Sequence, residues 1–533
     1  FTSSFPAATD AQSRGFSEIL AGNHTLISAP TGSGKTLAAF LVAIDRLVTL
    51  EAQSASTTRV LYVSPLRALA FDVEKNLRAP IVGIRHAAER LGANFREPLV
   101  AMRTGDTSAR DRQRMLRNPP DILITTPESL YLMLTSSARS TLVNVDTVII
   151  DEIHAVAATK RGAHLALSLE RLEELTVKPP QRIGLSATQR PLEEVARFLG
   201  GYRDGTPRPV AIVDAGARKT LEVEVVVPVE DMGELGKVTH ELRSGPATAA
   251  GVERRTSIWP SITPRILELV QQHRSTIIFC NARRGAERLA AQLNELAADL
   301  GLSSTPSGAQ NDSGTGADGA GMTGDFVKAH HGSLAREQRI VIEDQLKRGQ
   351  LRGIVATSSL ELGIDMGAVD LVIQVESPGA VSRGLQRIGR AGHAVGSPSR
   401  GKVFPKHRHD LLEVAVVAQR MLDAEIETTR YLRNPLDVLA QHIVAHVSMH
   451  PDVSVAVLTA MIKRCANFAE LSDEVRNNVL DLLAGRYPSE EFRDLKPRIV
   501  WDRIADTLRA RDGAQRLAVT NGGTIPDRGL FGV

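Results

Sequence analysis

The 533-residue sequence has few of the features that secreted and membrane proteins depend on. It holds two cysteines, Cys280 and Cys465, which excludes a disulfide framework and favours a reducing compartment, so we expect a cytoplasmic protein. No apolar run reaches the roughly 18 residues that suggest a membrane-spanning helix, and no secretory signal is visible. Basic residues (64) nearly balance acidic ones (61), and the net charge is only +3. Any nucleic-acid footprint must therefore be local.

What the chain does contain is a repeated alternation of short apolar runs and amphipathic stretches. Strands that alternate with helices form parallel, doubly wound sheets, so this pattern predicts an α/β fold with two lobes. We expect strands at residues 25–29, 60–64, 122–125, 147–151 and 184–186 of the first lobe, and at 276–280, 326–330, 354–356 and 371–374 of the second.

The alternation and composition divide the chain into five segments. Residues 303–324 are almost all small or polar and are predicted to form a disordered insertion in the second lobe. Helices are expected near 410–423, 434–449, 453–464 and 472–484, and a strand at 516–520. The predicted segments are a first lobe at 1–210, an inter-lobe connection at 211–260, a second lobe at 261–415, a mostly helical, winged-helix-like domain at 416–512 and the start of a further β-rich domain at 513–533.

Residues 29–36 read A-P-T-G-S-G-K-T between a predicted strand and a predicted helix, as a phosphate-binding loop requires. Its glycines let backbone N–H groups face phosphates, its lysine reaches the β- and γ-phosphates, and the hydroxyl of Thr36 ligates Mg²⁺. Ala29 stands where the strict pattern has glycine, and the alternative is a chance Gly-rich turn. We predict an ATP site at Thr31, Gly32, Ser33, Gly34, Lys35 and Thr36.

A second motif, V-I-I-D-E-I-H, spans residues 148–154 and ends an apolar strand in two carboxylates. We expect Asp151 to hold Mg²⁺ and Glu152 to orient and deprotonate the attacking water. His154 has a plainer alternative as a local hydrogen-bonding residue. The S-A-T triplet at 186–188 is predicted to couple nucleotide to strand, although Ser and Thr also cap helices.

Positive charge for the γ-phosphate is predicted to come from S-R-G-L-Q-R-I-G-R-A-G-H at 382–393. Arg387 and Arg390 share one helix face as candidate arginine fingers, and Gln386 is a candidate coupling residue. The alternative is a solvated basic helix. In T-S-S-L-E-L-G-I-D (357–365), Gly363 would allow close backbone approach and Asp365 would bond a ribose hydroxyl or a finger, unless the segment is a plain loop. Residues 383–410 hold seven Lys and Arg against Asp410, a local basic footprint.

Together these motifs resemble superfamily 2 helicases over roughly residues 10–410. A narrower resemblance, to the bacterial large helicase-related family, is carried by H-A-V-A-A-T-K-R-G-A-H-L-A-L-S-L-E-R-L (154–172), S-P-G-A-V-S-R-G-L-Q-R-I-G-R-A-G-H (377–393), F-P-K (404–406) and G-G-T-I-P-D-R-G-L-F-G-V (522–533). It implies two tandem RecA-like lobes, a winged helix and a further C-terminal domain. It also implies ATP-dependent 3′-to-5′ translocation on single-stranded DNA, unwinding of duplexes and RNA:DNA hybrids, and a role in DNA repair.

The resemblance places Gln12 where related helicases read adenine, although a solitary surface glutamine is the alternative. Strand binding is expected at loop ends, each of which is alternatively a helix cap. The candidates are Ser64, Pro65, Arg67, Thr104, Gly105, Thr126 and Pro127 in the first lobe and Asn281, Arg283, His331, Thr357 and Ser358 in the second. Expected partners are single-stranded DNA and tailed DNA or RNA:DNA duplexes. Two other functions stay open: an RNA-remodelling ATPase, and a nucleotide-dependent DNA clamp that recruits partners without unwinding.

Overall fold

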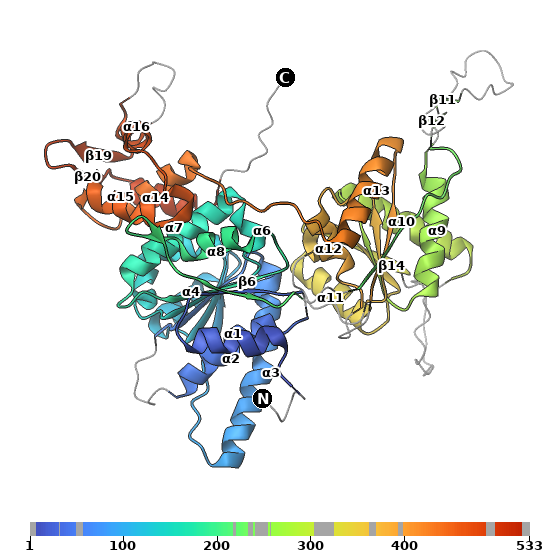
Figure 1. The fold of residues 1–533 in the computed structure, drawn as a ribbon, viewed down its shortest axis with the longest axis horizontal. Coiled ribbons are helices and arrows are strands. Elements are labelled where there is room, and N and C mark those ends of the chain that lie inside the picture. Colours follow the sequence, from blue (N-terminus) through green and yellow to red (C-terminus); the bar gives the residue numbers. More distant parts are fainter. Residues whose placement is uncertain are drawn as a thin grey trace, which may run out of the picture. The chain divides into compact units, whose positions relative to one another are not determined.

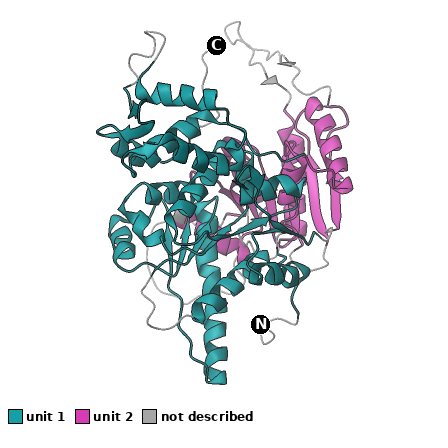
Figure 2. Ribbon diagram, turned by 60° about the vertical axis from the view of Figure 1, so that its left-hand side comes forward, with its two compact units in different colours: residues 1–216, 428–533 teal, residues 217–427 magenta. Residues whose placement is uncertain are grey.

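The computed structural model divides the chain into two compact units (Figures 1 and 2). Unit 1 comprises residues 1–216 and 428–533, and unit 2 comprises residues 217–427. The structure describes residues 7–30, 32–49, 57–216, 220–232, 238–239, 254–255, 257–302, 325–361, 369–392, 398–486 and 496–524.

Unit 1 is built on a seven-stranded parallel sheet of order β3-β4-β2-β5-β6-β1-β9. The five predicted strands of the first lobe are confirmed, and the four shortest of them are buried along their whole length because helices cover both faces. The two strands at the edges of the sheet, β3 and β9, were not predicted from the sequence. The strands are β1 (Thr25–Ser28), β2 (Val60–Val63), β3 (Val100–Arg103), β4 (Ile122–Thr125), β5 (Thr147–Ile150), β6 (Gln181–Ser186) and β9 (Ala211–Asp214).

Helices pack on both faces of this sheet and form two separate cores. One core includes Ile19, Phe40 and Leu69, and the other includes Leu130, Leu167 and Phe198. A doubly wound sheet of this kind gathers the carboxyl ends of its strands at one edge. The helices are α1 (Asp10–Leu20), α2 (Lys35–Val48), α3 (Arg67–Leu91), α4 (Ala109–Arg117), α5 (Pro127–Leu134), α6 (His154–Ala157), α7 (Lys160–Leu175) and α8 (Leu192–Gly200).

The C-terminal part of unit 1 has the helices expected of a winged helix, with a three-stranded antiparallel sheet of order β18-β20-β19. The prediction of a strand at 516–520 is wrong, because these residues form part of helix α17 (Ala514–Thr520). Ala514 and Ala518, four residues apart, are both buried, which is a helical spacing. The other elements are α14 (Leu436–Val447), β18 (Val453–Ser454), α15 (Val455–Arg464), α16 (Asp473–Ala484), β19 (Ile499–Asp502) and β20 (Thr507–Ala510).

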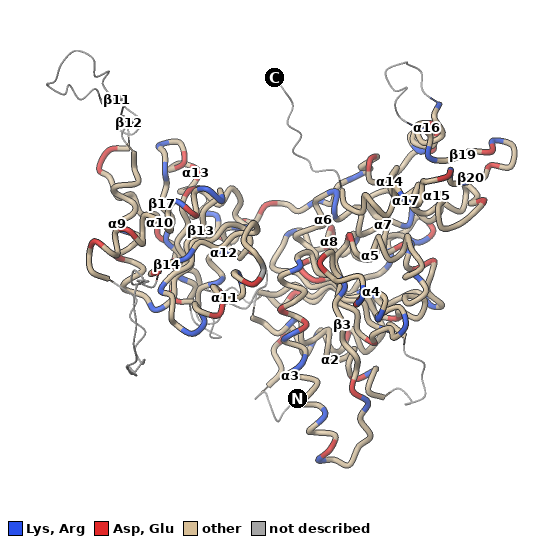
Figure 3. The backbone as a smooth tube through the Cα atoms, turned by 180° about the vertical axis from the view of Figure 1, so that it is seen from behind, with Lys and Arg blue, Asp and Glu red and all other residues tan. Residues whose placement is uncertain are grey.

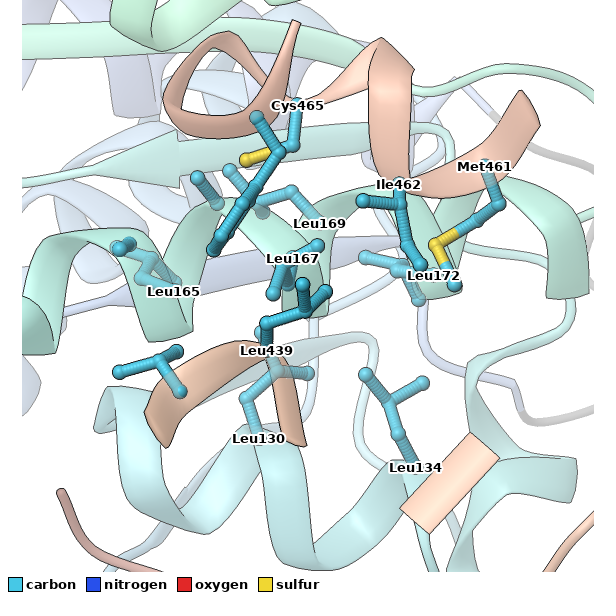
Figure 4. Close-up of a cluster of buried hydrophobic side chains, with 14 of the residues drawn as sticks. Leu130, Leu134, Leu165, Leu167, Leu169, Leu172, Leu439, Met461, Ile462 and Cys465 are labelled. Atoms are coloured by element: carbon cyan, nitrogen blue, oxygen red, sulfur yellow. The ribbon is translucent and has the colours of Figure 1, made fainter. Parts of the chain in front are cut away.

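This winged-helix region shares a hydrophobic core with the first lobe, although more than 200 residues separate them in the chain (Figure 4). Leu130 of α5 and Leu169 of α7 lie in the same cluster as Leu439 of α14 and Ile462 of α15. Burial of four such side chains is worth roughly 6–12 kcal/mol in transfer free energy. The region is therefore packed into the first lobe.

Unit 2 has a six-stranded parallel sheet of order β10-β17-β16-β13-β15-β14. The four predicted strands are confirmed. Two more at one edge were missed, and β10 lies in the stretch expected to connect the lobes. Residues 303–324, the predicted insertion, lie outside the described residues. The elements are β10 (Leu221–Val225), α9 (Trp259–Gln272), β13 (Thr276–Phe279), α10 (Arg283–Asp299), β14 (Val327–His330), α11 (Arg336–Lys347), β15 (Gly353–Ala356), β16 (Leu371–Val375), α12 (Val381–Ile388), β17 (Ser399–Phe404) and α13 (Arg408–Asp423).

Candidate nucleotide and nucleic-acid sites

The predicted phosphate loop connects the end of β1 to the start of α2. Gly32 and Gly34 have φ values of 81° and 79°, in the left-handed region that favours glycine. A Cβ atom on Gly34 would also overlap the side-chain amide of Gln12, so a larger residue here would displace Gln12. Lys35 begins α2 and is buried. Thr31 lies outside the described residues.

Gln12 is buried and tied to this loop, so it is not a solitary surface residue. Its Oε1 accepts from the Thr9 N–H at 3.0 Å, and its Nε2 donates to the Gly34 carbonyl at 3.4 Å. Thr9 in turn donates from its hydroxyl to the Ser33 carbonyl at 2.8 Å. The N-terminus of α1 therefore braces the loop, and the adenine-reading role of Gln12 stays a prediction.

The two carboxylates of the second motif follow β5 and are both buried. The Tyr62 hydroxyl donates to Asp151 Oδ2, and the backbone N–H of Glu152 donates to Asp151 Oδ1 at 2.9 Å. Burial and, next, the neighbouring charge of Glu152 raise the pKa of Asp151 to about 7, although the Tyr62 hydrogen bond and the Lys35 charge oppose the rise. A divalent cation would relieve the repulsion of this buried acidic pair, so the residues fit a Mg²⁺ site.

His154 joins the acidic motif to the S-A-T segment. Its Nδ1 accepts from the Ala187 N–H at 3.2 Å and lies 3.3 Å from Ser186 Oγ, while Glu152 Oε2 lies 3.6 Å from the same nitrogen. Burial lowers the pKa of His154, which keeps the imidazole neutral and able to accept. His154 is therefore a physical link between the two motifs.

The first-lobe candidates for strand binding all follow neighbouring strands, β2, β3 and β4, at the carboxyl edge of the sheet. Arg67 and Asp106 form an ion pair of 2.6 Å that connects two of these loops. Thr126 caps α5 by accepting from the Ser129 N–H, and Pro127 is the first residue of that helix. The helix-cap alternative therefore holds for Thr126. Ser64 Oγ donates to the Leu66 carbonyl, and Thr104 and Gly105 lie in the loop after β3.

Arg161 was missed by sequence reasoning, although it belongs to the family-specific stretch at 154–172. Its guanidinium donates to the Pro65 carbonyl and, at 2.9 Å from Nη2, to Glu128 Oε2. Burial alone would raise the pKa of Glu128, but its bonds to Arg161 hold it below its usual value. Arg161 thus fixes two of the candidate strand loops on α7.

In unit 2, both predicted finger arginines contact Glu361. Arg387 is buried and donates to the Glu361 carboxylate, to Asn281 Oδ1 at 3.0 Å and to Gln374 Oε1 at 2.8 Å. Arg390 donates to the Glu361 carbonyl at 2.7 Å. The alternative of a solvated basic helix is therefore wrong for Arg387. Burial lowers its pKa and the carboxylate of Glu361 opposes that shift.

The remaining unit 2 candidates follow β13, β14 and β15, which are neighbours in the sheet. Arg283 donates to Ser333 Oγ at 2.7 Å, and His331 Nε2 lies 2.9 Å from Glu287 Oε1. Thr357 and Ser358 come directly after β15. Gln386 lies on α12, half-buried. Gly363, Asp365 and the terminal His393 of the arginine motif lie outside the described residues.

The predicted basic footprint at 383–410 is mostly neutralised within unit 2. Besides Arg387, four more of its cations form ion pairs with carboxylates: Arg383 with Glu361, Arg400 with Glu222, Lys402 with Glu224 and Lys406 with Glu376. The sequence shows the cations of this segment but not these partner carboxylates, which lie outside it.

Over the part of the chain that the structure describes, no helix is both long and apolar enough to cross a membrane.

Comparison with known proteins finds three matching families. The DEAD/DEAH box helicase family matches residues 9–196, the helicase conserved C-terminal domain matches residues 323–395, and the winged helix domain of the large helicase-related protein matches residues 419–533. A relative from Mycolicibacterium smegmatis, named Lhr helicase/probable uracil glycosylase, is 54% identical over 100% of this chain and 34% of its own length. An Escherichia coli Lhr helicase/uracil glycosylase is 49% identical over 100% of this chain and 35% of its own length.

The fold is similar to that of a solved relative. The structure of Mycobacterium smegmatis helicase Lhr bound to ssDNA and AMP-PNP matches with a TM-score of 0.85 and 53% identity, over 100% of this chain and 62% of that one. The present chain spans about a third of the length of the two curated relatives, at 34% and 35%. The two lobes found here are therefore RecA-like, and the C-terminal part of unit 1 matches the winged helix domain of the large helicase-related protein.

Proposed function

Since the chain belongs to the large helicase-related family of superfamily 2 helicases, we propose that it is an ATP-driven translocase that moves on single-stranded DNA and unwinds duplexes. The observation that carries the proposal is the buried acidic pair, Asp151 and Glu152, which His154 joins to Ser186 and Ala187. That arrangement connects the residues proposed to hydrolyse ATP to a second segment of the same lobe.

The chemistry of the first lobe follows from its polar groups. Backbone N–H groups at Gly32 and Gly34 and the ammonium of Lys35 bind the phosphates. Thr36 and Asp151 hold Mg²⁺, which when bound neutralises charge that develops on the phosphates. Glu152 orients the attacking water and accepts its proton. Asp151 must be ionised to act as a ligand, and the Lys35 charge favours that state.

For the two arginines we propose different roles. Arg387 is held by Glu361, Asn281 and Gln374, so it is a positioning residue that shapes unit 2. Arg390 donates from Nη2 to the backbone carbonyl of Glu361 at 2.7 Å. We keep Arg390 as the candidate to reach the γ-phosphate.

The finer properties rest on the family. They are 3′-to-5′ polarity, unwinding of RNA:DNA hybrids, a role in DNA repair and a cytoplasmic location. The loops after β2, β3 and β4 support strand binding because they lie at one edge and present hydroxyls, backbone groups and Arg67, which contact phosphates without reading bases. The solved mycobacterial relative was bound to ssDNA.

The test measures ATP hydrolysis without nucleic acid, with single-stranded DNA and with RNA of the same sequence, and then unwinding of 3′- and 5′-tailed DNA and RNA:DNA duplexes. We expect DNA-stimulated hydrolysis and unwinding of 3′-tailed substrates. Better stimulation by RNA would favour the RNA-remodelling function. Stimulated hydrolysis without any strand separation would reduce the proposal to translocation, and hydrolysis indifferent to nucleic acid would overturn it.

A further inference from the structure

Among the described helices of unit 1, only α4 has no buried residue. It is nonetheless well formed: the Ser108 side chain caps it by accepting from the Asp111 N–H at 3.1 Å. A helix without buried residues gains little stability from packing, so its side chains are available for contacts with other molecules.

The segment formed by α4 and the loop before it is more basic than the chain as a whole. Residues 103–117 hold five arginines and two aspartates, which gives as much net positive charge as the whole protein, +3. Both aspartates are engaged locally, since Asp106 pairs with Arg67 at 2.6 Å and Asp111 accepts from the Ser108 hydroxyl at 2.7 Å. Of the five arginines, Arg110, Arg114 and Arg117 are exposed, whereas Arg103 and Arg112 are half-buried.

Three of these arginines form one stripe. Arg110, Arg114 and Arg117 are spaced four and three residues apart, which places them on one face of the helix. All three are exposed, and their guanidinium groups form no hydrogen bond or ion pair with any residue that the structure describes. Figure 3 shows basic residues in blue along the tube at α4. The segment at 383–410 differs, because there most cations face carboxylates.

The stripe begins next to a loop assigned above to strand binding. Arg112, on another face of α4, donates to the Gly105 carbonyl at 3.0 Å and anchors the helix to that loop. From Arg110 to Arg117 the helix rises about 10 Å, a length over which one strand of B-DNA presents about three phosphates. The stripe thus extends the candidate path beyond the loop.

We propose that Arg110, Arg114 and Arg117 bind the phosphate backbone of DNA outside the loops of the candidate strand path. The inference rests on the proposed function, because it extends the same path. Guanidinium groups suit phosphates through charge and paired N–H donors, and such contacts are independent of sequence. The phosphates belong either to the continuing single strand or to the duplex arm of a tailed substrate.

The experiment compares a triple variant, Arg110→Gln, Arg114→Gln and Arg117→Gln, with a control of equal charge change. The control, Lys75→Gln, Arg90→Gln and Arg511→Gln, removes three exposed cations of unit 1 whose side chains also have no partner among the described residues. Affinity for a long single strand and for a 3′-tailed duplex is measured from 50 to 200 mM salt, values at which counterion release is well resolved.

We expect the triple variant to flatten the plot of log affinity against log salt by about 2 for a single strand, or by nearly 3 for a duplex, while the control keeps the wild-type slope. A change on both substrates assigns the stripe to the continuing strand, and a change on the tailed duplex alone assigns it to the duplex arm. The corresponding triple Arg→Lys variant should restore the slope, which separates lost charge from lost folding.

The inference is overturned if the triple variant and the control share the wild-type slope on both substrates. At saturating DNA, the triple variant should hydrolyse ATP as fast as the wild type, with only the DNA concentration for half-stimulation raised. If wild-type hydrolysis is not stimulated by DNA, the proposed function fails; if it is stimulated and the slope is unchanged, only the role of α4 fails.

Discussion

Gly162 provides a sharp test of how α6 and α7 hold the acidic motif. A Cβ atom at this position would overlap the Val156 carbonyl oxygen and lie 2.8 Å from the carbonyl carbon and 3.1 Å from Ala157 Cα. Non-bonded carbon atoms prefer about 3.5–4.0 Å, so Gly162→Ala forces α6 and α7 apart by roughly 0.5 Å or more. The atoms in the way are backbone, which cannot rotate aside as a side chain does.

Overpacking of this kind costs typically about 1–3 kcal/mol, and the backbone clash puts Gly162→Ala at the upper end. Gly83→Ala is the matched control, because Gly83 lies exposed within α3 and a Cβ there meets no atom within 4 Å. In an exposed helix this same change stabilises by about 0.5–1 kcal/mol. The two substitutions are therefore expected to change the free energy of unfolding in opposite directions.

Urea unfolding of both variants, followed by hydrogen exchange of residues 150–165, measures the difference. Because α6 carries His154, we also expect Gly162→Ala to lower DNA-stimulated ATP hydrolysis at least several-fold, and Gly83→Ala to leave it unchanged. Equal stabilities for the two variants would refute the reasoning, since they would show that α6 yields to the added methyl group without cost.

Three further predictions follow from the charged groups. Glu152→Gln should lower ATP turnover by at least about 100-fold while ATP binding persists, and normal turnover would remove Glu152 from its role. Arg390→Lys should lower the maximal rate of ATP hydrolysis and leave the stability of unit 2 unchanged. Arg387→Lys should instead destabilise unit 2 by about 1–3 kcal/mol, because three acceptors lose a planar donor. Hydrolysis rates and urea unfolding, measured separately, distinguish the two effects. Burial lowers the pKa of His164 from 6.5 to about 4, so its contribution to stability is complete above pH 6.5 and falls as the unfolded chain takes up a proton below it. Between pH 7 and pH 5 this residue alone should cost unit 1 about 2 kcal/mol in urea titrations, a loss that His164→Gln should abolish.

The sequence predicts the centre of each sheet better than its edges. Central strands such as β5 are buried on both faces and read as unbroken apolar runs. The edge strand β3 is only half-buried, and in the edge strand β10 half-buried residues alternate with exposed Glu. The neighbouring strand β17 contains Arg400 and Lys402. The sequence patterns of all three therefore resemble those of loops. Residues 516–520 favour a strand by composition, but tertiary packing of Ala514 and Ala518 makes them helical.

For the site, motifs predict which residues carry chemistry but not what holds them. Lys35 and Asp151 follow from their place between strand and helix. The Tyr62 hydroxyl on Asp151 and the Glu361 carboxylate on Arg387 do not, because these partners lie in other motifs far along the chain and only folding brings them together. Arg387 is the clearest case, since spacing on a helix cannot distinguish an arginine aimed at a ligand from one buried in its own unit.

The winged-helix region is coupled to the first lobe through α7, the second helix after the acidic motif. Glu170 of α7 is buried and accepts from Arg182 and Arg208 of the lobe and, at 3.2 Å, from Arg464 of α15. Burial alone would raise the pKa of Glu170, but these arginines hold it below its ordinary value. A buried carboxylate with this many cationic partners resists separation, because removing one leaves charge uncompensated.

A second contact on the same helix points to the same coupling. Lys160, at the start of α7, pairs with Asp437 of α14 at 3.0 Å, and the ring centroid of His164 lies 4.6 Å from that of His442 of α14. Since Arg161 between them holds the loops at Pro65 and Glu128, α7 contacts the candidate strand loops on one side and the winged helix on the other. A displacement of α7 would therefore reach both, and we expect the winged-helix region to move with the first lobe.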